Sequence, residues 1–133
     1  MLSAINAVRA QARTCGTAPF PAAPPLKWNA LLEQAALLHS QDMATNNYFS
    51  HDSRDGRKPW DRMAAQGYSY GAAAENIAAG QPDLASVIDA WVKSPGHCVN
   101  LMNAAYSEVG MARAENAAST YRIYWTQDFA SPR

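Results

Sequence analysis

Apolar residues recur every three to four positions in two stretches of the first 50 residues, and this spacing predicts two amphipathic helices. The first helix carries Leu2, Ile5 and Val8 on one face and is expected to stop before Gly16. The second runs from Trp28 to Asn46 and has the clearest apolar stripe. That stripe consists of Trp28, Leu31, Leu32, Ala35, Leu38 and Met43. Prolines between residues 19 and 25 predict an extended connector between the two helices.

The middle of the chain predicts two more helices separated by small residues. A polar loop over residues 48–58 precedes a short helix from Pro59 to Gln66. A glycine- and alanine-rich stretch then leads to Glu75–Ala78, which reads as a short strand or a turn. The fourth helix has Leu84, Val87, Ile88 and Trp91 at helical spacing, and the Pro95–Gly96 pair is expected to end it.

Two strands are predicted at the end of the chain, over residues 109–114 and 121–129, with a hairpin loop around Asn116 to Ser119. In the second strand one face carries Tyr121, Ile123, Trp125, Gln127 and Phe129, and the other carries Arg122, Tyr124, Thr126 and Asp128. Helices that come first and a hairpin that comes last predict an α+β fold rather than a doubly wound parallel sheet.

Length and charge narrow the class of protein. The 133 residues suit a single domain, residues 1–133, that can bury its own core. Lys and Arg number 11, as do Asp and Glu, so the net charge is zero and a nucleic-acid partner is not expected. No stretch approaches the roughly 20 apolar residues of a membrane span. No signal peptide is visible, so either the protein is not exported or the sequence begins at the mature end.

The two cysteines, Cys15 and Cys98, leave two interpretations open. They are either buried thiols of a cytosolic protein or one long-range disulfide formed in an oxidising compartment. A bridge that closes so long a loop would stabilise the fold by about 4–5 kcal/mol in the chain-entropy model.

His51, Glu75 and His97 are the candidate chemical residues. His51 lies in a polar loop, His97 follows a helix boundary, and Glu75 interrupts an apolar stretch. Two imidazoles and a carboxylate that converge suit a metal with an open position or acid–base chemistry, whereas separate loop histidines would only form ordinary hydrogen bonds. His39 is expected to be a helix residue with a satisfied hydrogen bond, and Cys98 beside His97 is not expected to be a nucleophile.

Five stretches, taken in order, resemble the CAP superfamily of cysteine-rich secretory, antigen-five and pathogenesis-related proteins, and most of all its bacterial branch. These stretches are residues 47–51, Asp55-Gly56 with Pro59-Trp60-Asp61-Arg62, residues 74–80, residues 91–102, and Tyr124-Trp125-Thr126-Gln127-Asp128-Phe129. The resemblance covers nearly the whole chain.

The resemblance implies an α-β-α sandwich with a small, mostly antiparallel sheet and an open cleft, an extracellular location with the signal peptide removed, and a Cys15–Cys98 disulfide. His51, Glu75 and His97 match the cleft residues of the family, although Ala74 replaces the usual glycine. Ser94 stands where the second acid is expected, so only the two histidines, with water and Glu75, would hold Zn²⁺ or another divalent ion weakly.

Three functions follow from these expectations. The leading hypothesis is a monomeric secreted module, without enzymatic activity, that binds a small apolar ligand such as a lipid or sterol, or a component of the cell envelope. The alternative is an extracellular hydrolase or peptidase that uses His51, Glu75 and His97, for which Ser50, Ser94 and Thr126 are the only candidate nucleophiles. In the third, His51, Glu75, Asn76 and Gln127 form a polar network that only fixes the cleft loops.

Overall fold

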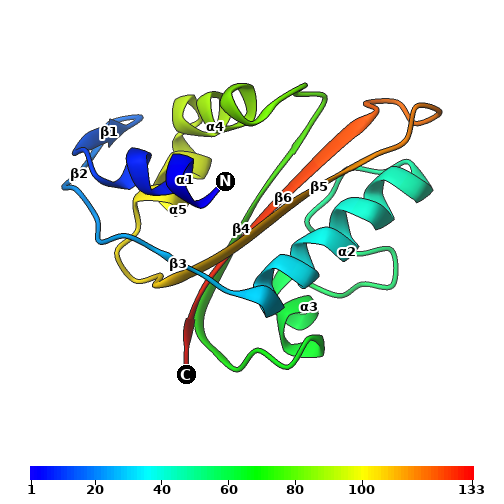
Figure 1. Cartoon of the computed structure of the whole chain (residues 1–133), viewed down its shortest axis with the longest axis horizontal. Helices are drawn as coiled ribbons and strands as arrows, with labels where there is room; N and C mark the ends of the chain where they lie inside the picture. Colours follow the sequence, from blue (N-terminus) through cyan, green and yellow to red (C-terminus); the bar gives the residue numbers. More distant parts are fainter.

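A computed structural model describes all of residues 1–133, and it shows helices on both faces of one sheet (Figure 1). The helices are α1 (Leu2–Arg9), α2 (Ala30–Asn46), α3 (Pro59–Ala65), α4 (Leu84–Lys93) and α5 (Pro95–Met102). The strands are β1 (Arg13–Cys15), β2 (Ala18–Phe20), β3 (Lys27–Trp28), β4 (Tyr70–Ala79), β5 (Glu108–Glu115) and β6 (Ile123–Pro132). None of the helices is long and apolar enough to cross a membrane.

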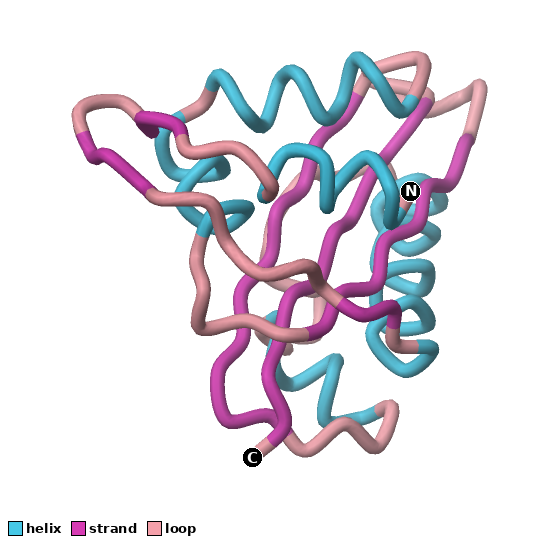
Figure 2. Tube along the Cα trace, turned by 60° about the vertical axis from the view of Figure 1, so that its left-hand side comes forward, coloured by secondary structure: helices cyan, strands magenta, loops and turns pink.

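The main sheet has the order β3-β5-β6-β4, with β4 along one edge, and only the short β3–β5 pair is parallel. Helices α1, α4 and α5 cover one face, and α2 with α3 covers the other (Figures 1 and 2). The first face buries the largest apolar cluster, which includes Ile5, Val87, Trp91, Leu101, Val109, Trp125 and Phe129. The predicted α-β-α sandwich is therefore confirmed, and both faces of β6 are buried because helices lie on each side.

The second helix begins later than predicted, and its buried face differs in part from the predicted apolar stripe. The side chain of Asn29 accepts hydrogen bonds from the backbone N–H groups of Leu31 and Leu32, which starts α2 at Ala30 and leaves Trp28 in β3. The predicted stripe was wrong at Leu31 and Leu38, which are 39% and 44% exposed. The predicted Leu32, Ala35 and Met43 are buried as expected. The rest of the buried face carries small and polar residues, among them Ser40, which pairs with the strand residue Thr126 at 2.7 Å.

Other predicted boundaries were also wrong. The first helix ends at Arg9, and the chain then forms the β1–β2 hairpin over residues 13–20, partly where the helix was expected to continue before Gly16. Pro95 does not end helical structure but opens α5, because proline fits the first turn of a helix. The short strand or turn expected at Glu75–Ala78 is the centre of the ten-residue β4, and Tyr121 precedes the last strand instead of belonging to it.

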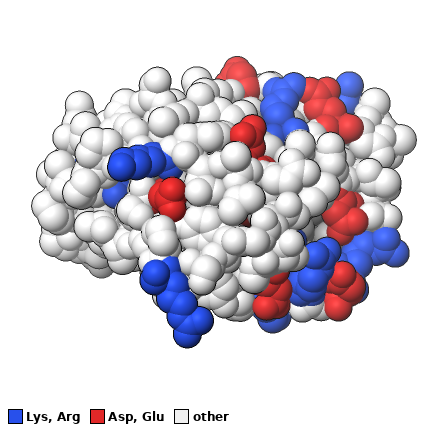
Figure 3. All heavy atoms as spheres, turned by 60° about the horizontal axis from the view of Figure 1, so that its bottom comes forward, with Lys and Arg blue, Asp and Glu red and all other residues white.

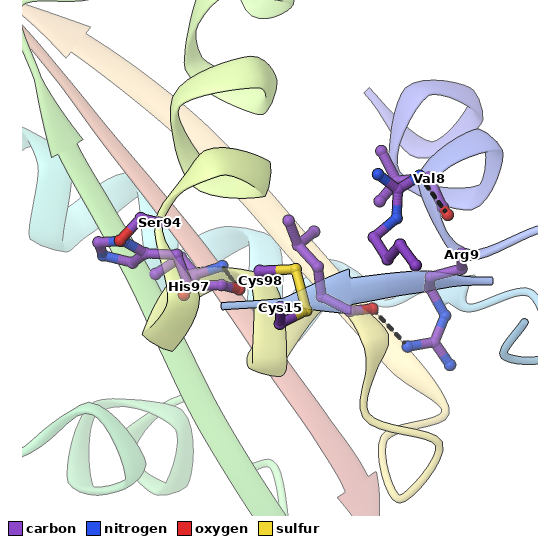
Figure 4. Close-up of a disulfide and its surroundings, with 9 residues drawn as sticks. Val8, Arg9, Cys15, Ser94, His97 and Cys98 are labelled. Atoms are coloured by element: carbon purple, nitrogen blue, oxygen red, sulfur yellow. Dashed lines mark hydrogen bonds between the residues drawn. A yellow bond between two sulfur atoms is a disulfide. The ribbon is translucent and has the colours of Figure 1, made fainter. Parts of the chain in front are cut away.

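The two cysteines form a disulfide that joins β1 to α5 across 83 residues of sequence (Figure 4). Beside this bridge, the fully buried Arg9 donates hydrogen bonds to the backbone carbonyls of Pro24, Leu101 and Asn103. These contacts tie the N-terminal segment to α5, and α5 carries one wall of the candidate site.

Candidate functional site

Glu75 lies at the centre of the polar residues that the sequence singled out. It sits on the edge strand β4, and its side chain is 1% exposed. One carboxylate oxygen lies 3.0 Å from Nδ1 of His51, and the other accepts a hydrogen bond from Arg62 at 2.7 Å. Both oxygens are therefore engaged, one by a side chain that reaches the surface and one by a buried guanidinium.

Arg62 holds the loop that carries His51. From α3, its guanidinium also donates to the backbone carbonyl of His51 at 2.7 Å and to the hydroxyl of Ser53 at 3.0 Å. Burial alone would raise the pKa of Glu75, but the hydrogen bond from His51 and the charge of Arg62 outweigh it, so the pKa lies below its ordinary value. Glu75 is therefore an ionised carboxylate although its side chain is buried.

A second buried carboxyl group faces Glu75 across the strand pair. Asp128 of β6 lies opposite Glu75 in the register and is fully buried, and no donor group of the protein reaches either of its oxygens. In its neutral form the Asp128 hydroxyl can donate a hydrogen bond to the Glu75 carboxylate. Burial, together with the negative charge of Glu75, raises the pKa of Asp128 well above its ordinary value. We conclude that Glu75 carries the charge and that Asp128 is the group driven toward its neutral form.

His97 lies in α5, one residue before the disulfide cysteine Cys98. Its Nδ1 is 2.8 Å from the hydroxyl of Ser94, at the start of the same helix (Figure 4). Burial lowers the pKa of His97, and the charge of His51 lowers it further. Ser94 therefore contacts His97 directly, whereas Glu75 contacts His51.

Three amides connect the strand to α5. Asn76 donates to the backbone carbonyl of His97 at 3.2 Å and to the side-chain oxygen of Gln127 at 3.0 Å. Asn100 in turn donates to the side-chain oxygen of Asn76 at 2.9 Å. This network fixes α5, and His97 with it, against the sheet.

Two hollows follow the outer edge of β4. The first, of about 500 Å³, is lined by His51, Asp52, Lys58, Pro59, Trp60, Ala73, Ala74, Glu75, Asn100 and Tyr106. The second, of about 250 Å³, is mostly apolar and is lined by Phe49, Ile77, Ala78, Ala79, Gln81, Ala90, Trp91, Ser94 and His97. The predicted cleft residues therefore divide between two neighbouring hollows, with His51 and Glu75 in the first and His97 and Ser94 in the second.

These residues do not form a ready-made metal site. No group of three or more His, Cys, Asp or Glu side chains lies close enough together to hold a metal ion. Nδ1 of His51 is already engaged by Glu75, and Nδ1 of His97 by Ser94. Weak zinc binding by the two histidines stays a prediction. A calorimetric zinc titration of the wild-type protein and of the His51→Ala/His97→Ala variant tests it. Saturable binding by the wild type that is lost in the variant supports the prediction.

Replacing Arg62 by methionine is expected to lower the free energy of unfolding by about 3 kcal/mol at pH 7, because it leaves the Glu75 carboxylate buried without its strongest partner. The stabilisation that Glu75 gains from its lowered pKa is present at neutral pH and is lost as the pH falls through that pKa, so the cost shrinks in acid. Urea unfolding at several pH values measures it. The control is Arg57→Met, whose ion pair with Asp55 is exposed and so contributes little to stability. An equal loss in both variants would contradict this assignment.

Replacing Asp128 by asparagine is expected to stabilise the protein at pH 7 by on the order of 1 kcal/mol. Because the pKa of Asp128 is raised in the folded state, the free energy of unfolding falls as the pH rises from the ordinary aspartate range toward that pKa. Asparagine does not titrate, so the variant does not suffer this loss. The gain should therefore shrink toward pH 4. Melting temperatures at both pH values measure it, with Asp89→Asn on the exposed face of α4 as control. A loss of stability at pH 7 would show that the folded protein needs an ionised Asp128.

Comparison with known proteins agrees with this architecture. Residues 2–129 match the family described as "Cysteine-rich secretory protein family" (CAP). The chain belongs to the CAP family. It is 38% identical, over 105 residues, to the uncharacterized protein YkwD of Bacillus subtilis and 34% identical, over 104 residues, to the uncharacterized membrane protein YlbC of the same organism. The matched part is 79% and 78% of this CAP chain but only 39% and 28% of those relatives.

Solved structures show the same CAP fold. An extracellular protein containing an SCP domain from Bacillus anthracis is 34% identical, with a TM-score of 0.71 over 81% of this chain and 34% of that one. The venom allergen-like protein 4 of Schistosoma mansoni is 15% identical, with a TM-score of 0.66 over 98% of this chain and 83% of that one. The second likeness concerns the fold alone, which is retained at low identity.

Sequence reasoning missed three residues of the CAP site: Arg62, Asn100 and Asp128. Each lies within a stretch that pointed to the family, but none was given a role. A buried role for Asp128 was foreshadowed by its place in a strand rich in aromatic residues, where a carboxyl group has to be buried if both faces are covered. The role of Arg62 depends on how α3 meets β4, and no local pattern reveals that contact.

Proposed function

We propose that this CAP domain is an extracellular, monomeric binding module whose ligand is a small apolar molecule with one polar end, of the lipid or sterol kind. The observation that carries the proposal is the apolar hollow beside residues 77–79 of β4. Phe49 stands at this hollow and is 45% exposed, and its ring contacts Tyr121, which is 51% exposed, at 6.2 Å between centroids. Exposed aromatic side chains beside an apolar hollow are typical of ligand-binding surfaces.

The polar lining of the hollow favours a ligand with a hydroxyl group. Gln81 is held there by the indole of Trp125, which donates to its backbone carbonyl at 2.9 Å. The side-chain oxygen of Gln81 is buried and has no hydrogen-bond partner, so a turn of this side chain into the hollow would let it accept a hydrogen bond from a ligand. A hydroxyl group on an otherwise apolar body would satisfy that oxygen.

Binding is favoured over hydrolysis by the state of the polar residues. Both oxygens of Glu75 are engaged, and its carboxylate is ionised and shielded from solvent, which is a poor arrangement for activating water. Of the candidate nucleophiles, Thr126 is buried against Ser40, and Ser94 contacts a histidine that has no acidic partner. An extracellular setting is supported by the disulfide and by the description of the Bacillus anthracis relative as extracellular.

Binding of a fluorescent sterol that carries a free hydroxyl tests the proposal, with the methyl ether of the same sterol as a matched ligand. We expect saturable binding, about tenfold weaker for the ether and about tenfold weaker in Phe49→Ala, as one lost hydrogen bond or apolar contact predicts. The control is Trp60→Ala, which removes an exposed side chain from the other hollow and should leave the affinity unchanged. Equal affinity of Phe49→Ala and wild type, or no saturable binding, would overturn the proposal.

A further inference from the structure

The larger hollow lies against backbone groups of β4 that have no partner in the sheet. Strand β4 pairs only with β6, so its other side is a sheet edge (Figure 2). The N–H of Gly80 donates to the carbonyl of Ile123, on β6, which indicates that even-numbered residues of β4 face β6. The carbonyls of Glu75 and Ile77 accept hydrogen bonds from Asn100 and Trp91 of the helices, so the odd-numbered residues face outward.

Only some of the outward-facing backbone groups of β4 have a hydrogen-bond partner. By this register the N–H and carbonyl of Ala73 and the N–H of Glu75 point away from β6, and the only side-chain hydrogen bond to the outward backbone here is that of Asn100 to the Glu75 carbonyl. Ala73 and Glu75 both line the 500 Å³ hollow. Residues 71–74 are one glycine and three alanines, so no large side chain stands on this part of the strand. An unpaired strand edge with small side chains lets another extended backbone approach closely.

The walls of this hollow indicate what kind of chain fits. Trp60, which is 41% exposed, and Tyr106 supply aromatic surface. The charged groups are already paired: Lys58 binds Asp52 at 2.7 Å, and Glu75 binds Arg62 and His51. The interspersed charges in Figure 3 likewise form no extended patch of one sign on the face shown. Charge complementarity therefore favours an uncharged segment that uses backbone hydrogen bonds and one apolar or aromatic side chain.

We propose that the edge of β4 at residues 71–75 is a docking site for an extended, uncharged polypeptide segment, which adds a strand to the sheet and places a side chain between Trp60 and Tyr106. This site is distinct from the apolar hollow at residues 77–79, and its occupation does not depend on a ligand there. Recognition by main-chain pairing, with one pocket for a side chain, is an established mode of peptide binding.

The test uses the whole chain and a panel of end-capped pentapeptides of threonine and valine whose central residue is alanine, leucine, tyrosine or tryptophan. Binding is followed by NMR of the ¹⁵N-labelled protein, which reports both affinity and location. We expect at least one peptide to bind saturably with the largest shifts at residues 71–75. We expect N-methylation of its protein-facing amides to weaken binding at least tenfold, because it removes the donors of the added strand.

Two variants complete the test. Ala73→Pro removes an outward N–H that the sheet does not use, so it should keep the fold and weaken peptide binding at least tenfold. Trp60→Ala alters only an exposed side chain and should reduce the preference for an aromatic central residue. Absence of saturable binding by every peptide, equal binding of the N-methylated peptide, or shifts confined to residues 77–79 would each overturn the proposal, and the first two leave the sterol measurement unaffected.

Discussion

Replacing Gly110 by alanine is expected to lower the free energy of unfolding by more than about 4 kcal/mol, enough to prevent accumulation of folded protein. Gly110 lies in β5 directly beneath the start of α2. A β-carbon at this position would lie 2.0 Å from the backbone nitrogen of Glu33 and 2.3 Å from the carbonyl carbon of Leu32. These are backbone atoms of a helix, so no side chain can move aside, and the helix would have to shift away from the sheet.

The matched control is Gly96→Ala. Gly96 lies in α5, and a β-carbon there would meet nothing within 4 Å. Because alanine favours a helix more than glycine does, this variant should be neutral or slightly more stable. Urea unfolding of the soluble fraction compares the two variants. A Gly110→Ala protein that unfolds within about 1 kcal/mol of wild type would contradict the close packing of α2 on β5.

Reducing the Cys15–Cys98 disulfide is expected to cost about 4–5 kcal/mol, close to the loop-closure value for a sequence separation of 83. The bridge fixes the N-terminal hairpin to α5, and α5 carries His97 and Asn100. Reduction should therefore lower the melting temperature and loosen the wall of the candidate site. Melting in a phosphine reductant, followed by a thiol count, measures the effect. An unchanged melting curve with both thiols free would rule out this stabilising role.

Much of the fold followed from the sequence, and the misses have physical causes. Helical periodicity found α1, α2 and α4, and Pro59 marked the start of α3. The aromatic and β-branched residues found β6, although both of its faces are buried. Helix α5 was missed since Pro95 is equally suited to end one helix or to begin another. Strand β4 was underestimated because alanine and glycine have low strand propensity, and its length is imposed by pairing with β6.

The candidate site was predicted only in part. The sequence suggested that His51, Glu75 and His97 converge, whereas the structure brings His51 to Glu75 and Ser94 to His97. Their distribution over two hollows depends on where β4 runs between the loop and α5, and this is a tertiary property. Arg62 and Asp128, the buried residues beside Glu75, are 13 and 53 positions away from it in sequence. Local sequence patterns do not connect residues at such separations.

The most direct test of the proposed binding function is an NMR titration of the ¹⁵N-labelled protein with a short-chain alcohol such as 1-octanol, which has an apolar body and one hydroxyl group. We expect saturable shifts centred on the backbone amides of Ile77, Ala78, Ala79 and Gln81, and on the indole of Trp91, all of which lie at the apolar hollow. Shifts that fail to saturate, or that centre on residues away from this hollow, would contradict it.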